Sequence, residues 1–381
     1  MIYLDHNATS PLRPEARAAM VRAMEVGGNP SSIHAAGRAA RAVIETARGQ
    51  VAAMAHARVQ DVVFTSGGTE ANALALAGAI YGAVDQDDRI TRLFVSAIEH
   101  DSVWANARSL VERVAGLRIE TIPVNSDGVI DTEALRVMLR EGKGRTLVAA
   151  MAANNETGVV QPLTEIARLA RDAKALLLID AIQVAGKSEL SIDADYLSLS
   201  SHKIGGPQGA GALVVREGAP FAAQILGGGQ ERSRRAGTEN VAGIAGFGAA
   251  AEQAQSGLAD LPRIAALRDR FETALVALGA TVFGAGSDRL ANTSNFALPG
   301  ITAETAIMAL DLDGVMVSSG AACSSGKVKS SHVLRAMGVA DDVAARALRV
   351  SLGRNLTEAD VIIAVSAFSN MLARLRPRVA A

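Results

Sequence analysis

Short apolar runs that favour β-strands alternate with stretches of helical periodicity through the first half of the chain. The strand-like runs are residues 62–65, 93–96, 147–150 and 176–180. The helical stretches between them are residues 71–83, 102–115 and 163–173. This alternation predicts an α/β protein with a mainly parallel sheet that helices cover on both faces. Ligands of such sheets bind at the carboxyl ends of the strands, and the polar motifs of this chain fall at those ends.

A second series of strands and helices follows a helical stretch that runs from about residue 241 into the 250s. Its strand-like runs are residues 281–283, 293–296, 315–317 and 348–352. We place a domain boundary near Gly257, at the end of that helical stretch. The length of 381 residues agrees with a large domain joined to a smaller one.

Composition and charge exclude several classes of protein. Hydrophobic residues make up 49% of the chain and the formal net charge is -1, so we expect neither disorder nor direct nucleic-acid binding. The N-terminus lacks a basic segment followed by an apolar one, and no later run is long enough to span a bilayer. We therefore expect a soluble cytoplasmic protein without membrane contact.

Lys203 lies in a polar loop that directly follows an apolar run and ends in Gly205, Gly206 and Pro207. A lysine can form a Schiff base with an aldehyde cofactor and can afterwards carry the substrate's α-proton. A loop lysine is more often a solvated charge, so this motif alone leaves both interpretations open.

Asp180 ends the buried run of residues 176–179. A carboxylate at that position is costly without a cationic partner, and a protonated pyridine nitrogen would be one. Three residues later, Gln183 is able to hydrogen-bond the phenolic oxygen of the same ring. A helix N-cap or a loop salt bridge is the alternative role for Asp180.

Two further strand ends carry polar groups. Residues 65–72 contain Gly67, Gly68 and Thr69 between a strand and a helix, which suits an anion such as phosphate, although a plain turn is possible. His100 stands at the next strand-to-helix junction, where it would stack on a planar cofactor, relay protons or simply cap the helix. Asn155 follows a third strand and offers an amide to a ring oxygen or a substrate carboxylate.

Cys323 is the only cysteine, so neither a disulfide within the chain nor a multi-cysteine metal site is possible. It lies among small and polar residues at 318–331 without apolar periodicity, which favours a mobile loop and a reactive thiol over a packed one. Lys327 and Lys329 nearby would favour the thiolate.

Two basic features complete the set. Arg349 stands in a strand-like run of the second series, where it would bind a carboxylate through two parallel hydrogen bonds or form an interdomain salt bridge. The glycine-rich, basic run at 227–240 suits an anion or a subunit contact.

Together these motifs resemble the cysteine desulfurases of the NifS/IscS type, group I, within the class V aminotransferases of PLP fold type I. The resemblance runs from residues 3–9 and 29–34 to residues 348–354. It implies a large domain (14–256) with a mainly parallel seven-stranded sheet and a smaller α/β domain (1–13 and 257–381) that carries the cysteine loop, about 318–331.

The resemblance also implies a role for each motif residue. Lys203 would hold pyridoxal 5'-phosphate, Asp180 would pair with its ring nitrogen, and Gln183 would contact its phenolic oxygen. His100 would stack on the ring and take part in proton transfer, and Asn155 would help to hold ring and substrate. The implied phosphate ligands are Gly68, Thr69, Ser200, His202 and, from the neighbouring subunit of a homodimer, Thr238. Arg349 would bind the substrate carboxylate, and Cys323 would be the nucleophile that receives sulfur from L-cysteine.

A group I loop implies transfer to a sulfur-acceptor protein such as an iron-sulfur scaffold, with no metal site beyond a passing contact through Cys323. Two positions depart from the family pattern: Gly68 replaces a frequent alanine, and residues 206–209 lack the lysine often found after the proline. A selenocysteine lyase, another β-eliminating enzyme or a non-catalytic scaffold of the same fold remain alternatives.

Overall fold

The computed structural model describes residues 1–83, 89–319 and 331–375. Its main sheet has seven strands in the order β2-β8-β7-β6-β5-β3-β4. Their bounds are β2 (Val62–Thr65), β3 (Ile90–Ser96), β4 (Arg118–Ile122), β5 (Arg145–Met151), β6 (Leu176–Asp180), β7 (Tyr196–Ser200) and β8 (Gly211–Val215). The neighbouring strands from β4 to β7 in this order pair in parallel, whereas β8 is antiparallel to both β7 and β2. The predicted mainly parallel seven-stranded sheet is thus confirmed.

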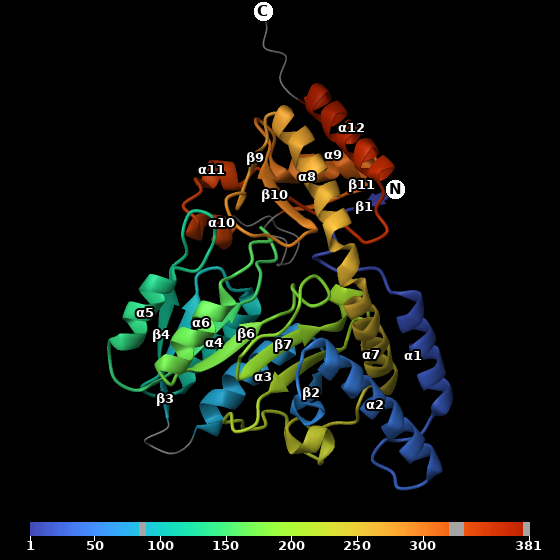
Figure 1. Cartoon of the computed structure of the whole chain (residues 1–381), viewed down its shortest axis with the longest axis vertical. Coiled ribbons are helices and arrows are strands. Elements are labelled where there is room, and N and C mark those ends of the chain that lie inside the picture. The colour runs from blue at the N-terminus through green and yellow to red at the C-terminus, as the bar shows by residue number, and fades with distance from the viewer. Residues whose placement is uncertain (84–88, 320–330, 376–381) are drawn as a thin grey trace, which may run out of the picture.

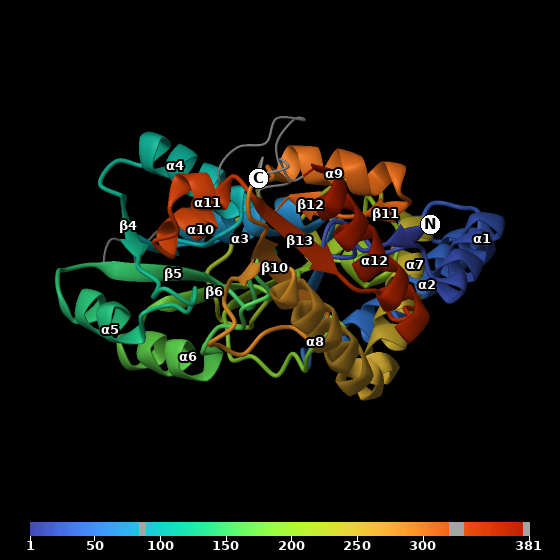
Figure 2. The same ribbon diagram turned by 90° about the horizontal axis from the view of Figure 1, so that it is seen from above.

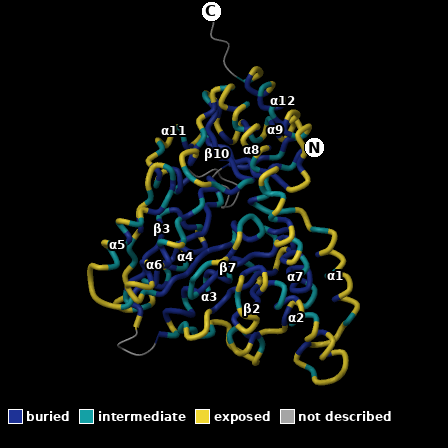
Figure 3. Tube along the Cα trace, viewed as in Figure 1, coloured by how far each residue is buried: buried dark blue, intermediate teal, exposed yellow. Residues whose placement is uncertain are grey.

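Helices cover both faces of this sheet, as Figures 1 and 2 show. Their bounds are α1 (Pro14–Val26), α2 (Ala35–Met54), α3 (Gly68–Gly82), α4 (Asp101–Arg113), α5 (Thr132–Arg140), α6 (Leu163–Asp172) and α7 (Val241–Ser256). Side chains alternate between the faces of a strand, so neighbouring residues of β3 enter different cores. Phe94 packs with α2, α6 and α7, while Leu93 and Val95 pack with α3 and α4. Figure 3 shows the sheet as the most deeply buried part of this region.

A second, smaller group of elements lies beyond the carboxyl ends of the parallel strands (Figure 1). Its four-stranded antiparallel sheet has the order β12-β13-β10-β9, and a parallel pair joins β1 to β11. The strands are β1 (Ile2–Tyr3), β9 (Thr281–Val282), β10 (Thr293–Ala297), β11 (Val315–Met316), β12 (Ser318–Ser319) and β13 (Ala347–Ser351). The helices are α8 (Leu261–Ala277), α9 (Ala303–Leu312), α10 (His332–Ala336), α11 (Asp341–Ala344) and α12 (Glu358–Leu375).

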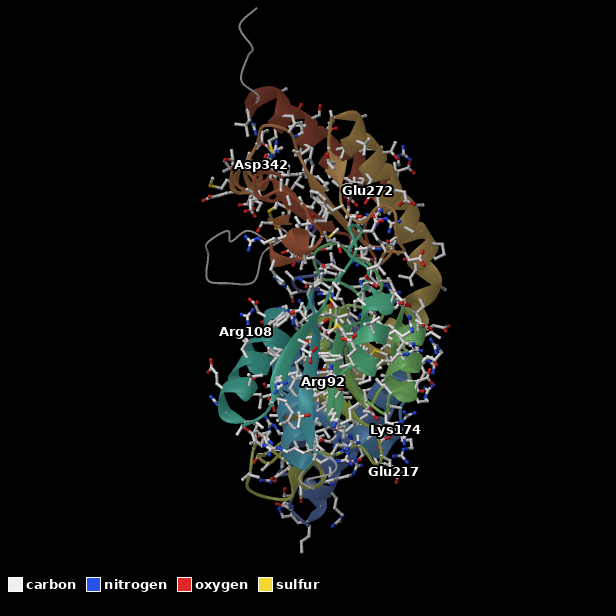
Figure 4. All side chains as sticks on the ribbon, turned by 90° about the vertical axis from the view of Figure 1, so that its left-hand side faces the viewer. Arg92, Arg108, Lys174, Glu217, Glu272 and Asp342 are labelled. Atoms are coloured by element: carbon white, nitrogen blue, oxygen red, sulfur yellow. The ribbon has the colours of Figure 1, made fainter. Side chains whose placement is uncertain are left out.

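This smaller group has a hydrophobic core of its own. Phe271, Phe296 and Phe368 meet edge to face at its centre, with ring centroids 5.5 to 6.0 Å apart. The side view in Figure 4 places Glu272 and Asp342 in this group and Arg92 in the large sheet. The division into domains at residues 13 and 257 stays a prediction. Within the described residues, no helix has the length and apolar character needed to cross a membrane.

Candidate active site

The parallel strands bring the predicted polar groups to one edge of the large sheet. Met151 at the end of β5 pairs with Asp180, and Asp180 in turn pairs with Ser198 of β7, so the three strands end close together. Lys203 follows β7 in a short 3-10 turn, η2 (Ser201–Ile204). His100 follows β3 and directly precedes α4. The fold therefore gathers residues that lie far apart in the sequence.

Asp180 is buried, with 6% of its surface exposed. Its Oδ2 accepts a hydrogen bond from Asn72 Nδ2 at 2.8 Å, and its Oδ1 accepts one from the Ile182 backbone N–H at 3.0 Å. The second bond is a local turn contact, and Asp180 does not cap any of the described helices. Within the described ranges, Asp180 forms no salt bridge, so a buried carboxylate faces the site without a protein cation.

Glu99 is a second buried carboxyl group beside Asp180. Its Oε1 accepts a hydrogen bond from the Met151 backbone N–H at 2.6 Å. Burial, reinforced by the negative charge of Asp180, raises the pKa of Glu99 well above its usual value. Burial and the neighbouring Asp180 therefore both disfavour the charged form of Glu99.

Lys203 contacts the N-terminal segment of the chain. Its Nζ donates hydrogen bonds to the backbone oxygens of Asn7 at 2.7 Å and Ala8 at 2.8 Å. Gly205 ends the η2 turn with φ +82°, and a Cβ there would lie 2.7 Å from the Arg13 side chain. The glycine is therefore required both by the left-handed conformation and by the close approach.

Asn7 connects Lys203 to Gln183 and to a second lysine that the sequence motifs did not single out. Gln183 Nε2 donates to the Asn7 backbone oxygen at 3.0 Å. Lys187 Nζ donates to Asn7 Oδ1 at 2.9 Å and to Gln183 Oε1 at 3.0 Å. Burial, with Lys203 and Arg349 nearby, lowers the pKa of Lys187 to about 7. The i, i+4 spacing of Gln183 and Lys187 was the only sequence signal for this contact.

The strand-to-helix turn before α3 lies beside the end of β7. A Cβ on Gly68 would lie 2.2 Å from Ile182 Cδ1 and 3.4 Å from Ser200 Cβ, so glycine at this position is matched to the isoleucine. Ser200 Oγ is buried and has no hydrogen-bond partner among the described residues. Thr69 is exposed at the start of α3, where free backbone amides attract anions.

His202 is held against the N-terminal segment. Its Nδ1 lies 3.2 Å from Thr9 Oγ1. Burial, and then the charge of Lys203, lowers the pKa of His202 to about 4. At neutral pH the ring is therefore neutral, and it would act on a phosphate through a hydrogen bond rather than through charge.

Arg349 projects from β13 and is 2% exposed. Its Nη2 donates to Asp5 Oδ1 at 2.6 Å and its Nη1 donates to the Asn155 backbone oxygen at 3.1 Å. The Nε atom is buried without a hydrogen-bond partner in the described part of the chain. Arg349 thus forms a salt bridge with Asp5, but both residues belong to the predicted small domain, so this is not the interdomain salt bridge considered above.

Asn155 contributes its backbone oxygen to this arrangement. That oxygen accepts hydrogen bonds from both Arg349 and Asn7, the latter at 3.2 Å. Its neighbour Asn154 shapes the turn, because Asn154 Oδ1 accepts from the backbone N–H groups of Glu156 and Thr157 at 2.9 and 3.0 Å. The predicted amide contact of Asn155 with a ligand stays a prediction.

Cys323, Lys327 and Lys329 lie outside the described residues. The segments on either side are held near the site: β12 pairs with β13 before the gap, and Ser331 caps α10 after it. Ser331 Oγ donates to Glu156 Oε2 at 2.5 Å. His332 Nε2 lies 2.9 Å from the backbone oxygen of Glu99. The chain therefore enters and leaves the cysteine segment beside the strand ends.

We expect the titration of Glu156 to make the free energy of unfolding depend on pH. Burial raises its pKa from 4.5 to about 7, against the lowering effect of the Ser331 hydrogen bond. A carboxyl group with a raised folded-state pKa contributes stability that is fully present below about pH 4.5 and is lost as the pH rises through 7. The Glu156→Gln variant should lack this loss.

Denaturant unfolding between pH 4.5 and 8 would measure the effect, with the exposed Glu141→Gln as the matched control. We expect the free energy of unfolding to fall less steeply with rising pH in Glu156→Gln than in the parent. If the free energy of unfolding changed with pH equally in the parent and in Glu156→Gln, the raised pKa of Glu156 would be contradicted.

Thr238 is exposed in the loop between η3 (Gln230–Ser233) and α7. In the preceding η3 turn, Glu231, Arg232 and Ser233 all have positive φ. A buried ion pair holds this strained backbone, because Arg48 donates to both carboxylate oxygens of Glu231 at 2.6 and 2.9 Å. Thr238 does not join the groups described above within one chain, so its predicted role in a neighbouring subunit stays untested.

The comparisons with known proteins identify the class. The family model described as aminotransferase class-V matches residues 2–363. The chain belongs to this family. Within it, the relatives identify a cysteine desulfurase of the NifS/IscS type, which confirms the resemblance.

Two curated relatives and one solved structure illustrate this. A cysteine desulfurase from Cereibacter sphaeroides is 44% identical over 94% of this chain and 92% of its own length. An IscS-like cysteine desulfurase from Mycobacterium tuberculosis is 38% identical over 99% of this chain and 97% of its own. The solved structure of a NifS-like protein superposes with a TM-score of 0.90 at 32% identity, covering 98% of this chain and 100% of that one.

Proposed function

We propose that this protein is a pyridoxal-phosphate-dependent cysteine desulfurase in which Lys203 and Cys323 perform the chemistry. The observation that carries the proposal is the meeting of Lys203, Asp180 and Arg349 at one edge of the sheet in a fold of this family. The net reaction converts L-cysteine and the Cys323 thiol to L-alanine and a Cys323 persulfide. The C–S bond breaks, an S–S bond forms, and the carbon that loses sulfur takes a proton.

The described residues fit the cofactor that the family implies. Asp180 is a buried carboxylate without a salt bridge among the described residues, which suits a protonated ring nitrogen. The unpartnered Ser200 hydroxyl and the amino end of α3 beside Gly68 suit a phosphate. When bound, pyridoxal phosphate supplies an electron sink for the negative charge that develops at the substrate's α-carbon.

The protein residues would supply binding and proton transfer. Lys203 would hold the cofactor and carry the α-proton, since it directly follows β7 and its side chain ends in an amine. Arg349 and Asn155 would hold the substrate carboxylate, and the ion pair of Arg349 with Asp5 would then be exchanged for one with the substrate. Gln183, Thr69, His202 and the Cys323 thiolate would act as the resemblance implies.

The defining test is the stoichiometry of the reaction. Purified protein loaded with pyridoxal phosphate should form one L-alanine for each persulfide on the peptide that contains Cys323, measured by amino-acid analysis and mass spectrometry. Pyruvate, ammonia and sulfide in place of alanine and the persulfide would favour a β-eliminating enzyme. Turnover of L-selenocysteine but not of L-cysteine would favour a selenocysteine lyase, and no turnover of either would favour a non-catalytic scaffold.

The assembly and the partners belong to the same proposal. We expect a homodimer in which Thr238 reaches the phosphate of the neighbouring subunit, and we expect Cys323 to pass sulfur to an acceptor protein such as an iron-sulfur scaffold in the cytoplasm. Light scattering of the active protein measures the first point. A fully active monomer would contradict the shared site.

A further inference from the structure

A chain of hydrogen bonds joins Asp180 to His100 through two residues that no motif singled out. Asn72 Nδ2 donates to Asp180 Oδ2 at 2.8 Å and to Ser102 Oγ at 2.9 Å. Ser102 Oγ lies 2.8 Å from His100 Nδ1. Asn72 and Ser102 are buried, with 0% and 6% of their surfaces exposed, so bulk water does not compete for these contacts.

The direction of each hydrogen bond follows from the donors available. A carboxylate accepts only, so the amide nitrogen of Asn72, rather than its oxygen, must face Asp180. The second N–H of the same amide then occupies a lone pair of Ser102 Oγ. The hydroxyl proton of Ser102 is left to point toward His100 Nδ1.

His100 Nδ1 also accepts a second hydrogen bond, from the backbone N–H of Ser102 at 3.0 Å. A nitrogen that accepts two hydrogen bonds carries no proton, and a neutral imidazole then carries its proton on Nε2. We propose that Asn72 and Ser102 are positioning residues that hold His100 as the neutral Nε2–H tautomer, so that the ring serves the site as a hydrogen-bond donor rather than as a base.

This inference rests on the proposed function and narrows the part that His100 plays in it. The basic lone pair of the ring is at Nδ1, inside the cap of α4, and protonation there would break both hydrogen bonds. An Nε2–H donor can stabilise negative charge on a substrate atom without accepting a proton. Proton removal from the substrate is thereby left to Lys203.

Several ionisable groups surround the network. Glu99 and Asp101 flank His100 in the sequence, Asp180 ends β6, and Glu156 lies in the turn after β5. His332, at the start of α10, contacts the Glu99 backbone. Ionised carboxylates nearby favour the protonated His100 ring, which cannot accept the hydrogen bond from the Ser102 backbone N–H. Variants must therefore be compared with the parent at the same pH and salt concentration.

The experiment is nitrogen NMR of the full-length protein with ¹⁵N-labelled histidine rings, with and without pyridoxal phosphate. His100→Gln identifies the signals of His100. In the parent at neutral pH, we expect Nδ1 to show the shift of an unprotonated ring nitrogen and Nε2 that of a protonated one. A protonated Nδ1 in the folded parent would overturn the proposal.

Two variants test the positioning residues. In Ser102→Ala, His100 Nδ1 loses the hydroxyl donor, and we expect the pKa of His100 to rise, while Ser102→Thr should restore it. Asn72→Leu removes the N–H that directs the Ser102 hydroxyl toward His100, and we expect it to raise the pKa of His100 by a smaller amount. An unchanged His100 pKa in Ser102→Ala, in protein shown by circular dichroism to be folded, would overturn the proposal.

Ser109→Ala is the matched control, since it removes a hydroxyl from the same helix and should leave His100 unchanged. The NMR result does not depend on turnover. If the protein fails to form a persulfide but His100 shows the expected tautomer, the proposed function fails while the positioning by Asn72 and Ser102 stands. If the persulfide forms but Nδ1 of His100 is protonated, the proposed function stands while the positioning by Asn72 and Ser102 fails.

Discussion

Replacing Lys203 with alanine is expected to lower the turnover of L-cysteine by roughly 10² to 10⁴-fold from the loss of proton transfer alone. The variant also loses the amine that would hold the cofactor covalently. No other lysine in the described ranges combines a place directly after a parallel strand with contacts to the N-terminal segment. Neighbouring Lys187 is already engaged by Asn7 and Gln183, so it is not expected to substitute.

Two measurements check this expectation. Alanine formation gives the rate, and borohydride reduction followed by mass spectrometry shows whether the cofactor is bound to the peptide of residue 203. Lys143→Ala, in an exposed loop, is the control and should behave as the parent does. Near-parent turnover in Lys203→Ala would refute the assignment of this lysine.

Replacing Cys323 with serine is expected to abolish persulfide formation while L-cysteine and the cofactor still bind. A hydroxyl is far less ionised than a thiol at neutral pH and attacks sulfur poorly. Removing the nucleophile of a catalytic unit costs up to about 10⁶-fold, so alanine formation should fall by at least roughly 10³-fold. The binding groups Lys203, Asp180 and Arg349 remain in place.

The single cysteine makes the readout unambiguous, because any persulfide on the chain must be on Cys323. Mass spectrometry after incubation with L-cysteine should show one added sulfur in the parent and in the control Ser325→Ala, and none in Cys323→Ser. Alanine formed by Cys323→Ser at the parent rate would show that Cys323 is not the nucleophile. Pyruvate and sulfide in place of alanine would favour a β-eliminating enzyme, and turnover of L-selenocysteine alone would favour a selenocysteine lyase.

Much of the candidate site could be predicted because its residues directly follow strands. Asp180, Lys203 and His100 each stand at the end of an apolar run, and the ends of parallel strands meet at one edge of a sheet. The local pattern is therefore enough to indicate that these three residues are neighbours. The sequence did not show that Gly68 leaves room for the Ile182 side chain, because this contact joins two different turns.

Asn7 and Lys187 were missed for a related reason. They lie 180 positions apart, and neither belongs to a pattern that predicts their contact. Arg349 had two open roles, and its hydrogen bond to Asp5 across 344 positions showed which partner it has. Contacts of this kind depend on how the N-terminal segment crosses the strand ends.

The sequence by itself determined the alternation of strands and helices, the reactive residue types and their family. These depend on short-range periodicity and on the order of motifs along the chain. Only the tertiary structure decided which long-range hydrogen bonds the reactive groups make, and with them the raised pKa of Glu99 and the link from Asp180 through Asn72 to Ser102. Hydrogen bonds and pKa values depend on burial and on neighbours brought close by folding, and neither is a property of the local sequence.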